Sequence, residues 1–356
     1  MKKAIKLFTA GILISLAALL GSCKKGTKVP PTPPPAKLNV YIAGFDEVNE
    51  FATYAEYWKN GVGSVLTIDG SQNTTPIGQD NTDATSIAVS DTNVYVAGAL
   101  IGVSLPVAAY WKNRSPVRLT DGTHDAYANS IVVTGSDVYV GGYENNGTSD
   151  VAKYWKNGNP VSLTDATKNA HINSIAVSGS DVYAAGSEFA YNGTTSSVAV
   201  YWKNATPVLL TDGTHNAYAN AIVVSGSDVY VAGYEYSGTT NVAKYWKNGT
   251  PVVLTDGTQT AQAASITLSG SDVYVAGFEG NGTTNVAKYW KNGTSVALTD
   301  GTRYALATSI VISGSDVYVA GLEENITYAL TAKYWKNGTP VILPNGTCAN
   351  AIALGK

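Results

Sequence analysis

The sequence repeats one unit seven times, and this repetition constrains the fold more than any local motif does. A Tyr-Trp-Lys-Asn motif recurs at intervals of 44 to 53 residues, with its tryptophan at Trp58, Trp111, Trp155, Trp202, Trp246, Trp290 and Trp335. A second motif, Val-Tyr-Val-Ala-Gly and its variants, also occurs seven times, with its tyrosine at Tyr41, Tyr95, Tyr139, Tyr183, Tyr230, Tyr274 and Tyr318. Two independent markers therefore agree on seven units.

Each unit divides into four short strands, which we name a to d. In the third unit the pattern predicts strands over 130–133, 138–144, 151–156 and 160–163. A Thr-Gly-Ser-Asp turn joins a to b, and Asn157-Gly158 joins c to d. Asn-Gly between two strand-like runs predicts a tight hairpin, because both turn residues take positive φ. A four-stranded antiparallel unit of this length is typical of a propeller blade.

The two ends of the repeat region complement each other. The first unit lacks strand a and begins with strand b at Leu38, whereas residues 349–354 read as a strand a with nothing after it. An open repeat array needs polar caps instead. We therefore predict an all-β fold over residues 37–356: a seven-bladed β-propeller of four-stranded antiparallel blades, closed by N- and C-terminal strands that share one blade. The 44% hydrophobic content is sufficient for such a core.

The N-terminal 36 residues predict export and attachment to a membrane. Residues 1–22 have a cationic start and an apolar run too short to span a bilayer comfortably, which indicates a signal peptide. The sequence Leu20-Gly21-Ser22-Cys23 resembles a bacterial lipobox, so we expect a lipid on Cys23. Residues 23–36 then form a lipidated, proline-rich tether. The prediction is an outer-membrane lipoprotein, and the sequence leaves open whether it faces the cell surface or the periplasm.

The repeats are similar to known bacterial repeat families. Ala-Asn-Ser-Ile-Val-Val from residue 128, followed by Asp-Val-Tyr-Val from residue 137, resembles the SBBP repeat of bacterial extracellular β-propellers. The Trp-x-Asn-Gly sequence with its following leucine resembles HAF-type extracellular repeats. These resemblances cover residues 38–354 and imply the fold and export, with no catalytic residues to transfer. Together with the lipobox, they suggest a lipoprotein of the Bacteroidota.

The charge balance excludes one class of partner. The net charge is −3, and removal of residues 1–22 leaves 20 basic residues against 26 acidic ones. The arginines are only three, Arg114, Arg118 and Arg303. Nucleic-acid binding needs clustered cations that neutralise phosphates, so we expect no nucleic-acid partner.

The order of the strands predicts where a ligand would bind. Turns a–b and c–d leave one face of the propeller and are short and nearly uniform. Loops b–c and d–a leave the other face and vary, for example at 189–193 and 71–83. Binding residues tend to lie on variable loops held by a rigid framework, so we place the site on the b–c/d–a face.

Two rings of uneven positions are predicted to surround the mouth of the central channel on this face. One ring lies four residues before the isoleucine of strand a and comprises Asp83, Tyr127, His171, Tyr218, Gln262, Leu306 and Cys348. The other lies two residues later and includes Asn129, Asn173 and Asn220. Aromatic faces beside amide groups suit a sugar or another small polar ligand. The alternative is that these side chains only plug the channel and bond to loop backbone.

Other repeated residues have structural explanations. The seven tryptophans are expected to pack between blades. The glutamates of strand b are expected to pair with the lysines of strand c across the sheet: Glu144 with Lys153, Glu235 with Lys244, Glu279 with Lys288 and Glu323 with Lys333. A carboxylate ring that binds cations is the alternative. We expect no metal, no cofactor and no catalytic role for the lone thiol of Cys348.

The predicted function is a lipid-anchored, non-enzymatic binding or scaffold propeller of the bacterial envelope. Its ligand is a glycan or a partner protein, and the sequence does not separate these two. The alternative is a polysaccharide hydrolase or lyase with its site at the channel mouth, which would require paired carboxylates. A third reading is a purely structural spacer. Propellers serve many functions, so the fold alone does not choose among them.

Overall fold

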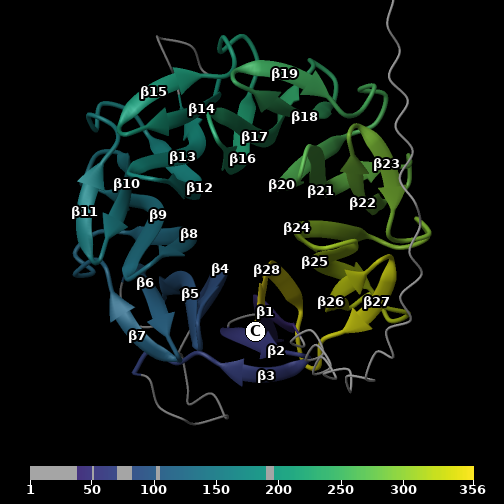
Figure 1. Ribbon diagram of the computed structural model, residues 1–356, viewed down its shortest axis with the longest axis horizontal. Helices are drawn as coiled ribbons and strands as arrows, with labels where there is room; N and C mark the ends of the chain where they lie inside the picture. The colour runs from purple at the N-terminus through teal and green to yellow at the C-terminus, as the bar shows by residue number, and fades with distance from the viewer. Residues whose placement is uncertain (1–37, 50–51, 70–81, 102–104, 190–195) are drawn as a thin grey trace, which may run out of the picture. The chain divides into compact units, whose positions relative to one another are not determined.

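The seven-bladed β-propeller is confirmed by the computed structural model, which describes residues 38–49, 52–69, 82–101, 105–189 and 196–356. These residues form 28 strands in seven four-stranded antiparallel sheets, arranged as a ring of blades (Figure 1). Residues 37–356 make one compact unit. In the described part of the chain, no helix has the length and apolar character needed to cross a membrane.

The blades follow one another along the chain, except that blade 1 joins the two ends. Blade 1 consists of β28 (Cys348–Gly355), β1 (Asn39–Asn49), β2 (Ala52–Lys59) and β3 (Val62–Val65). Blade 2 consists of β4 (Thr82–Ser90), β5 (Asn93–Leu100), β6 (Val107–Lys112) and β7 (Ser115–Arg118). Blade 3 consists of β8 (Ala126–Thr134), β9 (Asp137–Asn145), β10 (Asp150–Lys156) and β11 (Asn159–Ser162).

The remaining four blades keep the same order from strand a to strand d. Blade 4 consists of β12 (Ala170–Ser178), β13 (Asp181–Glu188), β14 (Val198–Lys203) and β15 (Thr206–Leu209). Blade 5 consists of β16 (Ala217–Ser225), β17 (Asp228–Tyr236), β18 (Asn241–Lys247) and β19 (Thr250–Val253). Blade 6 consists of β20 (Ala261–Ser269), β21 (Asp272–Gly280), β22 (Asn285–Lys291) and β23 (Thr294–Ala297). Blade 7 consists of β24 (Ala305–Ser313), β25 (Asp316–Glu324), β26 (Leu330–Lys336) and β27 (Thr339–Ile342).

The ring is closed by pairing between the two ends of the chain, as predicted. Strand β28 pairs antiparallel with β1, and Ile352 lies opposite Ile42. The strands a are innermost, and β28 contacts both β24 and β4 on either side (Figure 1). Every strand a therefore has a neighbour in both directions, so the sheet edges at the centre are covered.

Strand a starts earlier than the sequence pattern predicted. In the third unit we expected a strand over 130–133, whereas β8 begins at Ala126. The reason is a β-bulge, which shifts the register between Ala128 and Ser130 and lets the pairing with β9 continue beyond it. The same bulge occurs in every blade, so both rings of predicted site residues lie within strands and not in loops.

The bulge also explains the glycine of the Val-Tyr-Val-Ala-Gly motif. A Cβ atom on Gly142 would lie 1.9 Å from the carbonyl oxygen of Tyr127, at the bulge of the paired strand. Corresponding glycines meet the equivalent carbonyl at 1.7 to 2.0 Å in the other six blades. Only a residue without a side chain permits this close approach of two backbones.

The hydrophobic core lies between neighbouring blades. Trp155 of blade 3, for example, packs with Tyr95, Ala97 and Ala108 of blade 2. All seven tryptophans are at most 1% exposed, which confirms that they are core residues. Small alanines on strands b and c leave room for the large rings of the next blade.

Candidate functional site

The face that carries the a–b and c–d turns repeats one side-chain arrangement. In blade 3 the Lys156 ammonium lies 2.9 Å from Asp137 and 5.1 Å from the centre of the Tyr139 ring, while Asn157 Nδ2 donates to Asp137 (2.8 Å). The Asp–Lys pair recurs at 2.8 to 3.0 Å in blades 4 to 7, as Lys203–Asp181, Lys247–Asp228, Lys291–Asp272 and Lys336–Asp316. In blades 1 and 2, Asn39 and Asn93 replace the aspartate, and the lysine still lies over the tyrosine ring. The larger differences between blades lie on the other face.

The first ring of predicted site residues lies at the b–c/d–a ends of the strands a. Tyr127, His171, Tyr218 and Gln262 are each the second residue of their strand, and each is half-buried. Because the bulge extends strand a to this point, their side chains lie beside the neighbouring strand b of the same blade. Their positions are therefore set by sheet pairing and not by flexible loop backbone.

The structure brings three of these residues into one continuous aromatic stack across blades 3 to 5. Tyr127 stacks on Tyr143 with ring centres 5.4 Å apart, and Tyr143 stacks on His171 of the next blade at 3.9 Å. His171 meets Phe189 edge to face at 5.1 Å. Phe189 is 6.3 Å from Tyr218, which stacks on Tyr234 at 5.1 Å. We call these six residues the aromatic stack.

Half of the aromatic stack was missed by the sequence analysis. Tyr143 and Tyr234 lie opposite Tyr127 and Tyr218 in the strand pairing, and Phe189 directly follows β13. The signal was present in the repeat alignment: the strand-b position after the motif glycine is aromatic in blades 3 and 5 but is Ser187 in blade 4. The small serine in blade 4 coincides with a phenylalanine two residues later.

Polar contacts hold the aromatic stack in place. His171 Nε2 lies 2.8 Å from Asp150 Oδ2, and Asn145 Nδ2 donates to the other oxygen of this carboxylate (2.8 Å). Ser197 donates to the Tyr218 hydroxyl (3.2 Å). Burial raises the pKa of Tyr143, and it raises that of Tyr234 to about 12, so both phenols stay protonated near neutral pH.

The asparagines of the second ring are the bulged residues, and their amides link adjacent blades. Asn129, Asn173 and Asn220 donate through Nδ2 to the carbonyl oxygens of Ile172, Ala219 and Ala263 in the following blade, at 2.8, 3.0 and 2.8 Å. Asn350 donates in the same way across the closure, to Ala84 (2.8 Å). These donors are thus engaged by backbone, although the prediction that the asparagines contact a ligand stays a prediction.

Asp83 and Cys348 lie on adjacent blades of the first ring. Burial raises the pKa of Asp83. Burial, and to a smaller extent the Asp83 carboxylate, raises the pKa of Cys348 to about 12, and its thiol donates to Asn350 Oδ1 (3.2 Å). A thiol with such a pKa is protonated at neutral pH and is a poor nucleophile.

The predicted ion pairs between strands b and c are confirmed. The lysine–glutamate distances are 2.5 to 2.6 Å for Lys153–Glu144, Lys244–Glu235, Lys288–Glu279 and Lys333–Glu323. These carboxylates are neutralised within their own blade, so the alternative of a cation-binding carboxylate ring is not supported. Blade 2 has Leu100 at the glutamate position and Ala109 at the lysine position. Blades 1 and 4 also lack the ion pair, each through a different substitution.

In blade 1 an acid replaces the lysine. Glu56 stands at the lysine position and Asp46 at the glutamate position, so two carboxylates share the place of an ion pair. Glu56 is 8% exposed, and its Oε1 occupies the space that a Cβ on Gly63 would fill. Burial and the nearby Asp46 raise the pKa of Glu56 to about 7. The sequence carries a signal for this residue, because Glu-Tyr-Trp stands here where four other blades have Lys-Tyr-Trp.

Metal binding has no support among the residues described here. They contain no group of three or more His, Cys, Asp or Glu side chains arranged to hold a metal ion. Of the three histidines, His171 belongs to β12. His124 and His215 do lie in d–a loops, where each ring stands 3.2 Å from its neighbouring threonine hydroxyl.

These features define the chain as a seven-bladed β-propeller whose b–c/d–a face carries different side chains from one blade to the next. No family model and no curated protein matches the sequence. Among solved structures, the chain is similar to a puromycin-hydrolyzing peptidase of Mycobacterium tuberculosis, with a TM-score of 0.55 and 11% sequence identity. The match covers 85% of this chain and 53% of the peptidase, so the chain spans about half of that protein. At this identity the similarity shows the fold alone.

Proposed function

We propose that this protein is a lipid-anchored, non-enzymatic binding propeller of the bacterial envelope, with its ligand on the b–c/d–a face. One observation carries the proposal: the a–b/c–d face repeats its Lys–Tyr arrangement in every blade, whereas the b–c/d–a face holds the aromatic stack of blades 3 to 5. Structural packing alone would be served by the same residues in every blade. Differentiation on one face is what a binding site requires.

The aromatic stack favours a glycan as the ligand. All six rings are half-buried, so each leaves part of its surface open to solvent. Aromatic surfaces next to polar groups that are already held in place suit small polar ligands with apolar faces, such as sugars. A protein partner in an envelope complex is the other candidate that the sequence analysis named.

The proposed anchor precedes the propeller in the chain. Strand β1, with which the propeller begins, is a strand b and starts at the a–b/c–d face. The proposed lipid on Cys23, the tether over 23–36 and the signal peptide over 1–22 lie outside the described residues, and the SBBP-like and Bacteroidota assignments belong to the same proposal.

The enzyme alternative has one observation in its favour. Burial raises the pKa of Asp83, as a general acid would require. A retaining or inverting glycosidase needs a second carboxyl group nearby. The other positions of the first ring hold Tyr127, His171, Tyr218, Gln262, Leu306 and Cys348, none of which is a carboxylate. Binding without hydrolysis therefore remains our proposal.

A thermal-shift screen of the purified protein against oligosaccharides and polysaccharides tests the proposal. A ligand at 100 times its Kd adds about 2.7 kcal/mol to stability, which is easily seen. We expect a saturable shift that is lost in Tyr127→Ala and reduced in Tyr218→Phe. Tyr328→Ala is the matched control, because Tyr328 is 79% exposed on the b–c loop of blade 7, away from the stack.

Three outcomes would count against the proposal. A shift that Tyr127→Ala and Tyr328→Ala leave equally intact would place the glycan elsewhere. Release of reducing sugars by the wild-type protein, abolished in Asp83→Asn, would favour the hydrolase or lyase alternative. A flat screen would turn attention to a protein partner, to be sought by crosslinking on intact cells.

A further inference from the structure

Blade 4 is the one glutamate-bearing blade that lacks the strand-c lysine. In blades 3, 5, 6 and 7 this lysine neutralises the glutamate at the end of strand b, at 2.5 to 2.6 Å. In blade 4 the glutamate is retained as Glu188, but the lysine position is occupied by Val200. Val200 is fully buried and packs with Leu163, Ala170 and Trp202. No side chain of strand c therefore reaches the Glu188 carboxylate.

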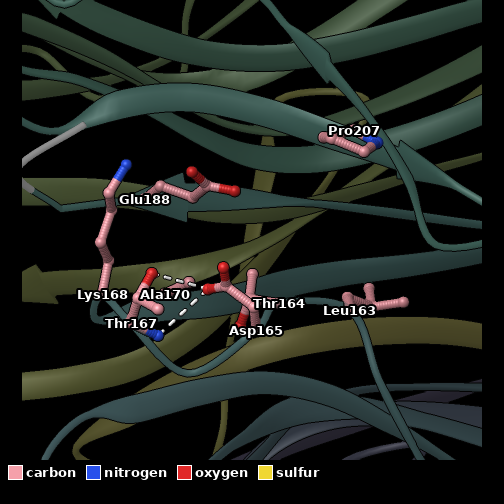
Figure 2. A pocket seen from close by; sticks show the side chains of 8 residues that line it. All are labelled: Leu163, Thr164, Asp165, Thr167, Lys168, Ala170, Glu188 and Pro207. Atoms are coloured by element: carbon pink, nitrogen blue, oxygen red, sulfur yellow. Dashed lines mark hydrogen bonds between the residues drawn. The ribbon is translucent and has the colours of Figure 1, made fainter. Parts of the chain in front are cut away.

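A pocket of about 350 Å³ lies at this carboxylate, between blades 3 and 4 on the b–c/d–a face (Figure 2). Its polar lining consists of Thr164, Asp165, Thr167, Lys168 and Glu188. Asp165 accepts two hydrogen bonds from Thr167, from the backbone at 3.1 Å and from the hydroxyl at 2.7 Å. Figure 2 shows that these bonds tie Asp165 to its own loop, while Glu188 extends from its strand without such a contact.

Several polar groups at this junction are left without partners. Within the described part of the chain, the Glu188 carboxylate makes no hydrogen bond and no ion pair that meets the usual distances. The Thr164 hydroxyl and the Trp202 indole nitrogen are buried without a hydrogen-bond partner there. Burial raises the pKa of Glu188, and the charge of Lys168 offsets this only in part. Two carboxylates and one ammonium leave the pocket with one net negative charge.

The next junction supplies a natural comparison. A pocket of about 340 Å³ between blades 4 and 5 is lined by the equivalent residues, among them Thr211, Asp212 and Glu235. There Lys244 lies 2.6 Å from Glu235, and the Thr211 hydroxyl accepts a hydrogen bond from the backbone of Ala199 (3.2 Å). What distinguishes blade 4 is therefore its glutamate, because the equivalent threonine hydroxyl is also without a partner among the described residues at Thr299, in a junction where Lys333 neutralises Glu323.

We propose that the pocket between blades 3 and 4 binds a primary alkylammonium group. This group would pair with the Glu188 carboxylate, as the strand-c lysine pairs with the equivalent glutamate in blades 3, 5, 6 and 7. A carboxylate partly removed from water gains most from a cation that donates hydrogen bonds to it. Leu163, Ala170 and Pro207 are the apolar residues that line the pocket, and they would contact the alkyl stem. The proposal rests on the binding role of the b–c/d–a face, but it uses no residue of the aromatic stack.

Titration of the purified protein with n-butylammonium at pH 8, followed by NMR, tests this proposal, with n-butanol as the uncharged control. We expect saturable binding of the amine and none of the alcohol. Glu188→Gln should weaken the binding at least tenfold. Val200→Lys should abolish it and raise the denaturation midpoint, because it supplies the ammonium from within the blade. Glu235→Gln is the matched control in the neighbouring pocket and should bind as the wild type does.

The proposal is overturned if Glu188→Gln binds within twofold of wild type, if n-butanol binds equally well, or if no saturable change appears up to about 100 mM amine. A peptide with a single lysine identifies the source of the amine. Binding more than tenfold tighter than n-butylammonium indicates a lysine of a partner protein, and equal binding indicates a free amine. Failure of the oligosaccharide screen leaves this result unaffected, because Tyr127 and Tyr218 do not line the pocket.

Discussion

A single bulged residue in each strand a determines how the blades are joined at the centre of the ring. Its side chain donates to a carbonyl of the next blade in six of the seven blades, through an asparagine amide or, at Thr85 and Thr308, through a hydroxyl at 2.7 and 2.6 Å. Blade 6 has Ala264 at this position and therefore lacks the bond to Ala307 of blade 7. The belt of hydrogen bonds is broken at this one junction.

Ala264→Asn should close the belt and stabilise the protein. A net gain of about 1 kcal/mol is expected for one added hydrogen bond to a carbonyl that otherwise lacks it. Asn220→Ala, which removes the equivalent bond in blade 5, should destabilise by a similar amount. Denaturant unfolding of the two variants and of wild type measures both effects. Equal midpoints for all three would show that the belt does not contribute to stability.

The buried acid Glu56 should make stability depend on pH. Its pKa is about 7 in the folded protein, against about 4.3 in an unfolded chain. Between these values the folded protein keeps the proton that the unfolded chain has lost, so rising pH favours unfolding. The free energy of unfolding should fall by about 4 kcal/mol as the pH rises from below 4.3 to above 7, and it should stay constant at higher pH.

Urea unfolding at pH 5 and pH 8 measures this effect. Glu56→Gln should be more stable than wild type at pH 8 and similar to it at pH 5. Glu56→Lys should gain still more at pH 8, since it restores a lysine opposite Asp46. The explanation is wrong if wild type and Glu56→Gln lose the same stability between the two pH values.

At the scale of the elements, the c–d hairpin turns show how local sequence and strand pairing agree. The Asn-Gly turns take positive φ at both residues, as at Asn157 (51°) and Gly158 (84°). Blades 2 and 4 keep the same turn without glycine, so Arg114 and Ala205 take φ values of 74° and 66°. The left-handed conformation is unfavourable for residues with a side chain. The pairing of the flanking strands therefore imposes the turn even where the sequence disfavours it.

Ala205→Gly should relieve this strain and stabilise the protein by about 1 kcal/mol. Gly249→Ala introduces the same strain into the blade 5 turn, where φ is 82° and a Cβ would meet no other atom, so it should destabilise by a similar amount. Thermal and denaturant unfolding compare the two. Changes of the same sign in both variants would contradict the explanation from backbone strain.

At the scale of the whole molecule, stability depends on closing the ring. The pairing of β28 with β1 completes blade 1, and Trp58 reaches across the junction to donate to the carbonyl of Pro344 (3.1 Å). Ile42 and Ile352 are both buried in the cluster between blades 7 and 1. Without β28, this cluster and the inner edge of β1 would meet water.

Deletion of residues 349–356 should therefore abolish single-transition unfolding. We expect a broad or multistep thermal transition and exposure of apolar surface to a hydrophobic dye. Deletion of Lys356 alone is the control, because this residue lies beyond β28. A shortened chain that melts as one sharp transition near the wild-type temperature would refute the requirement for closure.

Much of this architecture could be predicted from the sequence. The seven tryptophans, the Asn-Gly turns and the half-units at both ends predicted the blade number, the strand order and the shared blade. The four Glu–Lys pairs followed from the loss of both charges together in blade 2. These features recur in several units because each unit places the same residues in the same local environment. The sequence pattern was therefore sufficient to predict them.

The candidate site depended on tertiary structure. The bulge at Asn129 extends strand a and turns the asparagine amide toward the next blade. The glycine opposite the bulge is the one residue of the repeat whose sequence indicates that the bulge is present. Tyr143 meets His171, and Phe189 meets Tyr218, only because neighbouring blades lie side by side in the ring. The sequence by itself determined the blade, whose contacts are local and repeated. Only the tertiary structure decided which single departures from the repeat come together, because those contacts join residues of different blades.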